Sequence, residues 1–418
     1  MKILVLGASG LVGSALIDAL KPQGYCVKAI SKSAIESNTA TEYLALDLAQ
    51  YTAPEDWDEL LSGIDVVVNT VGIFAETAQQ SFAAQHVAMP TALFAACERS
   101  QIRVIQVSAL GAHPQAATEY WRSKGMADAD LMQRRCDWAI VRPSLIYAPQ
   151  GRSCRQFLQM ASWPLLPDLA GCGEVQPVHL ADVVATILAL IAAPAPLAQV
   201  VDVVGPQRYQ LGQWLAALRR SMGLTQAQRL RVPVHVQDAA AAVGQYLSRC
   251  LFSPASLQML RAGNCGDGTA MRALLGREEQ AALPARHDTG LAARAQLDWL
   301  LPVLRFSLAL VWLLTAAVCW WGWPHEQSLA LLAQVGIPAP WQWPMFVGAI
   351  ALDALLGVAC LMNWPWWRAQ ALLVLGYSLI IAMALPEYLL HPFGPVLKNL
   401  AVLALLLVVE QCERARGR

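Results

Sequence analysis

The sequence predicts an α/β domain built on a doubly wound parallel sheet with a small substrate-side region, followed by an all-α bundle of four transmembrane helices. Two observations carry this prediction. Short β-branched segments alternate with amphipathic helical stretches up to about residue 220, which is typical of a parallel sheet covered on both faces. The 418 residues are 56% hydrophobic, which is too apolar for an ordinary soluble protein, so part of the chain belongs in lipid.

The charge balance argues against a nucleic-acid-binding protein, and the cysteine spacing argues against a metal-binding or disulfide-linked one. Lysine plus arginine and aspartate plus glutamate both number 30, so no basic field favours a nucleic-acid partner. The ten cysteines are scattered, with neither a C-x-x-C pair nor a Cys/His cluster at metal-ligand spacing. We therefore expect reduced, structural thiols and no metal site.

Six segments are predicted to form the parallel sheet. They are residues 2–6, 25–30, 42–46, 65–70, 104–108 and 138–142. The first of them, in "MKILVLGASG", is too short for a secretory signal, so the N-terminal part is expected to stay in the cytoplasm.

The composition divides the chain into four parts. We expect a nucleotide-binding domain at 1–220, a helical connecting region at 221–299, a membrane domain at 300–412 and a cytoplasmic tail at 413–418. The apolar stretches predicted to span the membrane are 300–323, 345–363, 369–385 and 396–410. The "HPFGP" sequence at 391–395 predicts a turn before the last of them.

Tryptophans flank the predicted spans, and arginines concentrate on one side of them if there are four. Residues 324–344, between the first two spans, contain no Lys or Arg. This distribution places both termini in the cytoplasm, with the protein as a multi-pass component of a bacterial-type inner membrane.

A glycine-rich turn follows the first predicted strand in "LGASGLVGSALIDAL". Gly7 permits the tight turn, Gly10 lets the backbone approach a pyrophosphate, and Gly13 lets the following helix pack close to the sheet. The helix N-terminus then presents free N–H groups to phosphates. The pattern predicts a Rossmann-type dinucleotide site, to which we also assign Ser9, Leu11 and Val12.

The ends of the next strands indicate which nucleotide binds. The second strand ends in Ser31 and Lys32, where NAD-binding proteins usually carry an acid, so we prefer NADP(H) and keep NAD(H) as the alternative. Asp47 and Leu48 follow the third strand, and the aspartate is expected to contact the adenine. The sequence "NTVG" (69–72) closes the fourth strand, and its Thr70 and Gly72 are expected near the centre of the cofactor.

Several of these motifs together resemble a known family. "GASGLVG", "VSALGA", "YWRSK", "VRPSLIYAPQG" and "VQPVHLADVV" resemble an extended or atypical short-chain dehydrogenase/reductase over about residues 1–220. The chain is most similar there to NmrA-like proteins and to the dehydrogenase-like accessory subunit of respiratory complex I. "LRFSLALVWLLTA", "DALLGVACL" and "HPFGPVLKNLAVLALLL" resemble the DoxX-like membrane family over about 300–412.

The resemblance implies three catalytic residues. The family's Tyr-x-x-x-Lys matches Tyr120 and Lys124, and its serine matches Ser108. Tyr120 would protonate a carbonyl oxygen as hydride arrives, and Lys124 would lower the pKa of that phenol and hold the nicotinamide ribose. Ser108 would hydrogen-bond the substrate oxygen. The interval from Ser108 to Tyr120 is shorter than in typical extended enzymes, so their convergence on one oxygen stays open.

Other polar residues receive lesser roles. Residues 142–147 and 177–183 are expected to shape the substrate side, with Asp182 as a helix N-cap. In the membrane domain, Asp353 is expected to contact Lys398 or Arg305.

The leading hypothesis is a membrane-anchored NAD(P)H-dependent oxidoreductase that acts by hydride transfer on a small-molecule carbonyl or quinone-like substrate, including lipophilic ones. The alternative is a non-catalytic NAD(P)H-binding redox sensor or an assembly module of a membrane protein complex. A nucleotide-sugar epimerase or dehydratase shares the fold but is less favoured, because the sequence shows no recognisable sugar-nucleotide signature.

Overall fold

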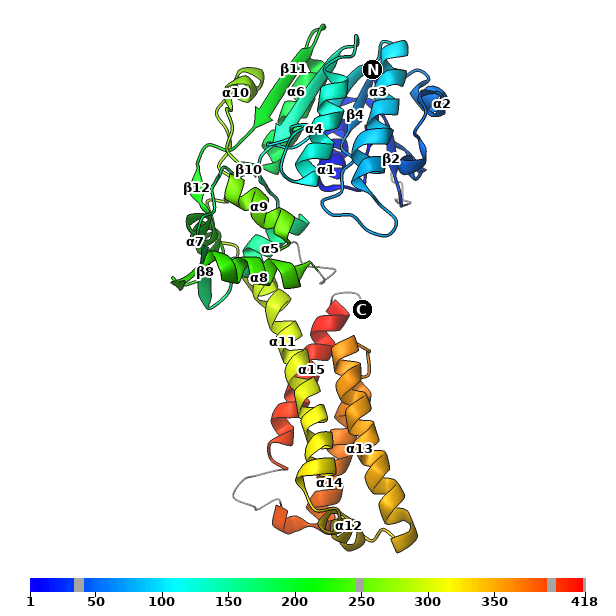
Figure 1. Ribbon diagram of the computed structural model, residues 1–418, viewed down its shortest axis with the longest axis vertical. Helices are drawn as coiled ribbons and strands as arrows, with labels where there is room; N and C mark the ends of the chain where they lie inside the picture. The colour runs from blue at the N-terminus through cyan, green and yellow to red at the C-terminus, as the bar shows by residue number, and fades with distance from the viewer. Residues whose placement is uncertain (34–40, 246–251, 389–395, 416–418) are drawn as a thin grey trace. The chain divides into compact units, whose positions relative to one another are not determined.

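The computed structural model describes residues 1–33, 41–245, 252–388 and 396–415 (Figure 1). The predicted turn at 391–395 and the last three residues of the predicted tail lie outside this part of the chain. The chain divides into two compact units, Met1–Ala293 and Arg294–Arg418, and each is described by itself below.

Unit 1 contains a seven-stranded parallel sheet in the order β11-β6-β5-β4-β1-β2-β3. Its strands are β1 (Lys2–Leu6), β2 (Cys26–Ser31), β3 (Thr41–Ala45), β4 (Val66–Asn69), β5 (Arg103–Val107), β6 (Trp138–Pro143) and β11 (Ala198–Val203). The order reverses between β1 and β4, which creates a crevice at the carboxyl ends of these strands. This confirms the predicted doubly wound sheet and adds β11 as an edge strand.

Helices cover both faces of the sheet. On β1, Ile3 and Val5 point into one core and Leu4 and Leu6 into the other, because successive side chains of a strand face opposite sides. The first core is closed by α1 (Leu11–Leu20) and α6 (Leu180–Ala192), and the second by α3 (Met89–Arg99) and α4 (Glu119–Leu131) (Figure 1).

The remaining elements of unit 1 are short. Its other helices are α2 (Asp58–Leu61), α5 (Arg152–Ala161), α7 (Leu211–Ser221), α8 (Val234–Gly244), α9 (Pro254–Ala262) and α10 (Thr269–Leu275), with helical turns η1 (Lys21–Gln23), η2 (Leu48–Gln50), η3 (Pro54–Trp57) and η4 (Ala83–Ala88). Three two-stranded sheets pair β7 (Ile146–Tyr147) with β10 (Val178–His179), β9 (Glu174–Val175) with β12 (Tyr209–Gln210), and β8 (Leu165–Leu169) with β13 (Gln228–Val232).

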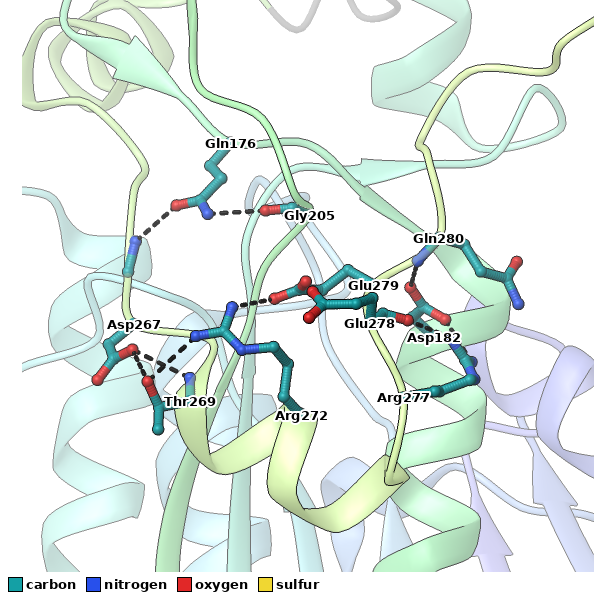
Figure 2. Close-up of polar contacts among 11 residues, drawn as sticks. Gln176, Asp182, Gly205, Asp267, Thr269, Arg272, Arg277, Glu278, Glu279 and Gln280 are labelled. Atoms are coloured by element: carbon teal, nitrogen blue, oxygen red, sulfur yellow. Dashed lines mark hydrogen bonds and ion pairs between the residues drawn. The ribbon is translucent and has the colours of Figure 1, made fainter.

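The segment around α10 packs back onto the sheet domain. Met271 is fully buried in the core between the sheet, α1 and α6. Arg277 Nη2 lies 2.6 Å from Asp182 Oδ1, and the backbone N–H of Gln280 donates to Asp182 Oδ2 at 2.7 Å. Figure 2 draws both contacts. Asp182 is therefore not the N-cap that the sequence predicts. His179 caps α6 instead, by accepting from the N–H of Ala181 at 3.1 Å. The fully buried carboxylate of Asp182 pairs with Arg277, because a buried charge requires a partner of opposite sign.

Unit 2 is helical. Its elements are α11 (Thr289–Ala317), which begins in unit 1, η5 (Val318–Gly322), α12 (His325–Gln334), α13 (Ala339–Met362), α14 (Trp367–Ala384), η6 (Pro386–Tyr388) and α15 (Asn399–Ala415). Within the described residues, three helices are long and apolar enough to cross a membrane: Thr289–Gly322, Ala339–Met362 and Trp367–Ala384.

The predicted fourth span corresponds to α15, and the ion pair predicted for Asp353 is not found among the described residues. α15 has 17 described residues and carries three charged side chains near its C-terminal end, so it is not among the candidate spans. Arg305 Nη1 donates to Glu413 Oε1 at 3.1 Å, whereas no ion pair with Asp353 is found in the described part of the chain. The Oδ1 atom of Asp353 is buried with no hydrogen-bond partner among the residues that the structure describes.

Candidate functional site

The glycine-rich turn joins β1 to α1 at the carboxyl edge of the sheet. Gly7 has φ +80°, a conformation that favours glycine, and a Cβ on Gly13 would lie 2.3 Å from the carbonyl oxygen of Gly7. Gly10 precedes α1 and offers no side-chain cap, so the first-turn N–H groups are available to a phosphate. Ser9 and Gly10 are exposed and Leu11 is half-buried, whereas Val12 packs into the core.

The end of β4 is tied to this turn. Thr70 Oγ1 donates to the carbonyl oxygen of Leu6 at 2.7 Å, which holds β4 against β1. Gly72 lies beside Lys124, because a Cβ on the glycine would be 3.1 Å from the ammonium nitrogen. Of the two predicted residues, Thr70 has a structural role and Gly72 leaves room for the lysine.

Lys124 lies on α4 and is buried. Its Nζ donates to the carbonyl oxygens of Val71 at 2.9 Å and Val107 at 3.2 Å, which follow β4 and end β5. Burial lowers the pKa of Lys124 to about 8, and the nearby Asp128 opposes this shift. The structure thus places a cation that titrates near neutral pH at the carboxyl ends of the central strands.

Tyr120 lies one helical turn before Lys124, in an aromatic environment. Its ring centroid is 5.2 Å from that of Phe74, 5.8 Å from that of His86 and 6.2 Å from that of Phe82. Burial raises the pKa of Tyr120 to about 12, opposite to the lowering expected from Lys124. The reason is that the ammonium of Lys124 is directed at backbone carbonyls, and the phenolic hydroxyl has no hydrogen-bond partner within the described residues.

Ser108 is engaged inside the protein. Its Oγ donates to Asp128 Oδ2 at 2.9 Å, and Arg142 donates to the same oxygen from Nε at 3.0 Å and Nη2 at 2.9 Å. Burial raises the pKa of Asp128, while the charge of Arg142 opposes this. Asp128 was missed at the sequence level, although its spacing from Tyr120 and Lys124 puts all three on one face of α4.

His86 is a second residue that sequence reasoning missed. The N–H of Ile73 donates to Nε2 at 3.0 Å, so Nδ1 carries the proton and donates to Ser123 Oγ at 2.9 Å. Ser123 in turn donates to the carbonyl oxygen of Tyr120 at 3.0 Å. Burial, aided by the charge of Lys124, lowers the pKa of His86 to about 2, so the ring is neutral and positions the start of α4.

At the ends of β2 and β3, Lys32 Nζ lies 2.8 Å from Asp47 Oδ2. The lysine lowers the pKa of Asp47, whose other oxygen accepts from the N–H of Ala49 at 3.3 Å. Ser31 Oγ donates to the carbonyl oxygen of Ser33, and Leu48 is buried in the core. The cation predicted for a 2′-phosphate is therefore already paired.

Cavities lie at both edges of the sheet in unit 1. One of about 300 Å³ lies near the loop after β5 and is lined by Leu110, Gly111, Glu174, Ala262, Gly263, Asn264 and Cys265. The larger, about 560 Å³, includes Met1, Asp65, Arg103 and Asp137 at the amino edge of the sheet, the opposite edge from the glycine-rich turn. The smaller cavity is thus the better placed for a substrate, since ligands of open α/β sheets bind at the carboxyl edge.

Two family models match the chain. Residues 7–190 match a family described as NAD(P)H-binding, and residues 309–407 match the DoxX-like family. The chain thus joins an NAD(P)H-binding domain to a C-terminal DoxX-like domain.

Curated relatives resemble the first part of the chain. NADH dehydrogenase [ubiquinone] 1 alpha subcomplex subunit 9, mitochondrial, of Arabidopsis thaliana is 26% identical over 255 residues, covering 58% of this chain and 63% of the relative. The Mus musculus protein of the same name is 27% identical over 218 residues, covering 50% and 57%. The chain therefore spans less than two thirds of the length of these relatives.

Solved structures share the fold. UDP-glucuronic acid 4-epimerase from Bacillus cereus in complex with NAD superposes with a TM-score of 0.55 at 16% identity, covering 71% of this chain and 100% of that one. A nucleoside-diphosphate-sugar epimerase from Staphylococcus aureus gives 0.54 at 16% identity, with the same coverage. At this identity the likeness concerns the fold alone.

Proposed function

We propose that this protein is a membrane-anchored NAD(P)H-dependent oxidoreductase that reduces a carbonyl or quinone-like substrate, including lipophilic ones. The observation that carries the proposal is the placement of Lys124 at the carboxyl ends of β4 and β5, with Tyr120 one turn away on the same helix. This is the edge of the sheet that also carries the glycine-rich turn.

The turn fits a dinucleotide. Its glycines leave a cradle that a Cβ on Gly13 would fill, and the uncapped N-terminus of α1 suits a pyrophosphate. When bound, the nicotinamide would supply a hydride to the substrate carbon. Tyr120 would donate its phenolic proton to the substrate oxygen, so hydride and proton together convert a carbonyl into an alcohol.

The charges of the site suit that direction of reaction. A phenol with a pKa of about 12 is protonated at neutral pH and is ready to act as an acid. Lys124, positively charged below pH about 8, would bind the nicotinamide ribose hydroxyls and stabilise the phenolate left after proton transfer. We further propose NADP(H) as the preferred nucleotide through Lys32, with NAD(H) as the alternative.

A second candidate function is a nucleotide-binding module without turnover, acting as a redox sensor or within a membrane complex. The hydrogen bond from Ser108 to Asp128 favours it, because this hydroxyl is then unavailable to a substrate oxygen. The similarity to a complex I subunit points the same way. A third candidate function, that of a nucleotide-sugar epimerase or dehydratase, is supported by the fold alone and is less favoured.

We also propose where the protein is located and which of its parts face the cytoplasm. We place the protein in a bacterial-type inner membrane, with the nucleotide-binding domain at 1–220, the connecting region at 221–299 and the tail at 413–418 on the cytoplasmic side. The membrane domain at 300–412 would bring the site close to substrates dissolved in lipid. Three candidate spans support membrane insertion, whereas the arginine distribution of the sequence supports the orientation.

The test uses the full chain in detergent. NADPH and NADH affinities are measured first, and consumption of each is then followed with a panel of quinones and aldehydes for the native chain and Tyr120→Phe. We expect the substitution to lower kcat by roughly 100-fold or more without weakening nucleotide binding. Tyr25→Phe, at the amino edge of the sheet, is the matched control.

Two results would contradict different parts of this proposal. Tight nucleotide binding with no turnover on any member of the panel would favour the sensor. Turnover that persists in Tyr120→Phe would remove this residue from the mechanism.

A further inference from the structure

The loop between β4 and η4 brings an exposed aromatic side chain to Tyr120. Phe74 is 40% exposed, and its ring centroid lies 5.2 Å from that of Tyr120 with 48° between the ring planes. Single exposed apolar side chains are normal on a protein surface, but this one lies against the residue that we propose as the proton donor. The uncovered part of the Phe74 ring is therefore available to a molecule bound beside Tyr120.

Hydrogen bonds anchor this loop on both sides of Phe74. The backbone N–H of Ile73 donates to His86 Nε2 at 3.0 Å, and the N–H of Phe82 donates to Glu76 Oε1 at 2.7 Å. A ring that the fold already holds in position loses little conformational entropy when it contacts a ligand. Phe74 is thus suited to discriminate between ligands rather than only to cover the site.

The surroundings of Tyr120 are aromatic and carry little charge. The rings of Phe82 and of the neutral His86 lie 6.2 Å and 5.8 Å from the Tyr120 ring, measured between centroids. Burial, and not a neighbouring carboxylate, raises the pKa of Tyr120. The ammonium of Lys124 is directed at backbone carbonyls. Aromatic rings pair favourably with other flat rings, whereas a charged group next to the reacting carbonyl would find no counter-charge on these side chains.

We propose that the carbonyl reduced at Tyr120 is conjugated with a planar ring, as in an aryl aldehyde or a quinone, and that Phe74 determines this specificity by contacting the ring. The inference rests on the proposed function, because it assigns the substrate class of the same site. A hydride from NAD(P)H forms the new C–H bond of an aryl aldehyde, and the electron pair of the C=O π bond takes the phenolic proton of Tyr120. The aldehyde is reduced to an alcohol, the nicotinamide is oxidised, and water returns a proton to the phenolate.

Matched ligands test the proposal with the full chain in detergent and NADPH bound. Benzamide and cyclohexanecarboxamide carry the same carbonyl group, are not reduced by a nicotinamide hydride, and differ in the planarity of the ring. We expect benzamide to bind roughly fivefold more tightly, as measured by saturation-transfer NMR, because aromatic pairs are stabilised beyond the area that they bury. The cyclohexyl ring is at least as apolar, so hydrophobic burial alone predicts no such preference.

Phe74→Leu keeps an apolar side chain but removes the ring, so it should make the two affinities equal. It should also lower kcat/KM for benzaldehyde relative to cyclohexanecarbaldehyde by roughly fivefold, mainly through KM, since the contact is made in the ground state as well. Trp163→Leu is the matched control, because it removes an aromatic side chain that is 37% exposed elsewhere in unit 1, and it should preserve both preferences. The NADPH affinity of each variant verifies that unit 1 remains folded.

The outcomes separate this inference from the proposed function. Equal affinities in the native chain, or a preference for benzamide that survives in Phe74→Leu, would overturn the inference even if both aldehydes are reduced. A preference for benzamide that depends on Phe74, together with no turnover of benzaldehyde, would support the ring contact and contradict the proposed enzyme.

Discussion

Lys32 and Asp47 form an ion pair of 2.8 Å at the place where the adenosine end of a dinucleotide would lie. The pair joins the strand end predicted to recognise a 2′-phosphate to the residue predicted to contact adenine. Because Lys32 lowers the pKa of Asp47, the carboxylate is charged at neutral pH and competes with a phosphate for the ammonium.

Removing either partner should therefore change nucleotide preference in opposite directions. Asp47→Asn frees the cation, so we expect the affinity for NADPH relative to NADH to rise roughly threefold to tenfold, while Lys32→Ala should lower it. Fluorescence titration of both nucleotides gives the ratio. Lys28→Ala, which removes another β2 cation paired at 4.0 Å with Glu42, should leave it unchanged. An unchanged ratio in Asp47→Asn would show that Lys32 does not read the 2′ position.

Lys124 should make nucleotide affinity depend on pH. Its ammonium is present below its pKa of about 8 and is lost above it, so affinity for NAD(P)H should fall as pH rises through this value. Dissociation constants measured from about pH 6.5 to about pH 9.5 give the profile. Lys124→Met should flatten this fall, whereas Lys124→Arg should move it above the range. A fall of equal size in Lys124→Met would assign it to another group.

Breaking the ion pair between the buried Asp128 and Arg142 should lower the free energy of unfolding strongly. Asp128 is 1% exposed and bonds both Arg142 and Ser108, so Asp128→Ala leaves a cation without its partner and should destabilise unit 1 by about 3 kcal/mol. Thermal unfolding followed by tryptophan fluorescence measures the loss. Asp130→Ala removes a partly exposed pair with Arg134 on the same helix and should cost no more than about 1 kcal/mol. Equal losses in the two variants would mean that the network around Asp128 contributes little.

Gly13 should tolerate no side chain. A Cβ there would lie 2.3 Å from the carbonyl oxygen of Gly7, so Gly13→Ala must displace the turn that would hold the pyrophosphate. We expect nucleotide affinity to fall by roughly 100-fold or more, as measured by titration calorimetry. Gly348→Ala is the control, because a Cβ there meets nothing within 4 Å. Native-like affinity in Gly13→Ala would place the nucleotide elsewhere.

Much of the fold follows from local patterns. The positions of β1, β4, β5 and β6 and the glycine-rich turn were predicted, because apolar strands and a Gly7–Gly10–Gly13 spacing depend on neighbours close in the chain. The three candidate membrane spans were predicted for the same reason, although all three helices begin earlier than expected. The predicted fourth span forms α15, which is not among the three candidate spans of the described residues, and α12 lies within the segment predicted to connect the first two spans.

The partners of charged side chains required the tertiary structure. Tyr120, Lys124 and Ser108 were singled out by resemblance, yet Ser108 bonds Asp128, Lys124 bonds two strand ends and Lys32 bonds Asp47. Each of these contacts joins residues distant in the sequence or on different elements. Spacing along the chain carries no information about them.

By itself, the sequence determined the doubly wound sheet, the nucleotide turn and the presence of membrane helices, since hydrophobic periodicity and glycine spacing are local properties. Only the tertiary structure decided the protonation of Tyr120 and Lys124, the pairing of Lys32 and the burial of Asp182. Those depend on desolvation and on nearby charges, which arise when the strands and helices pack together.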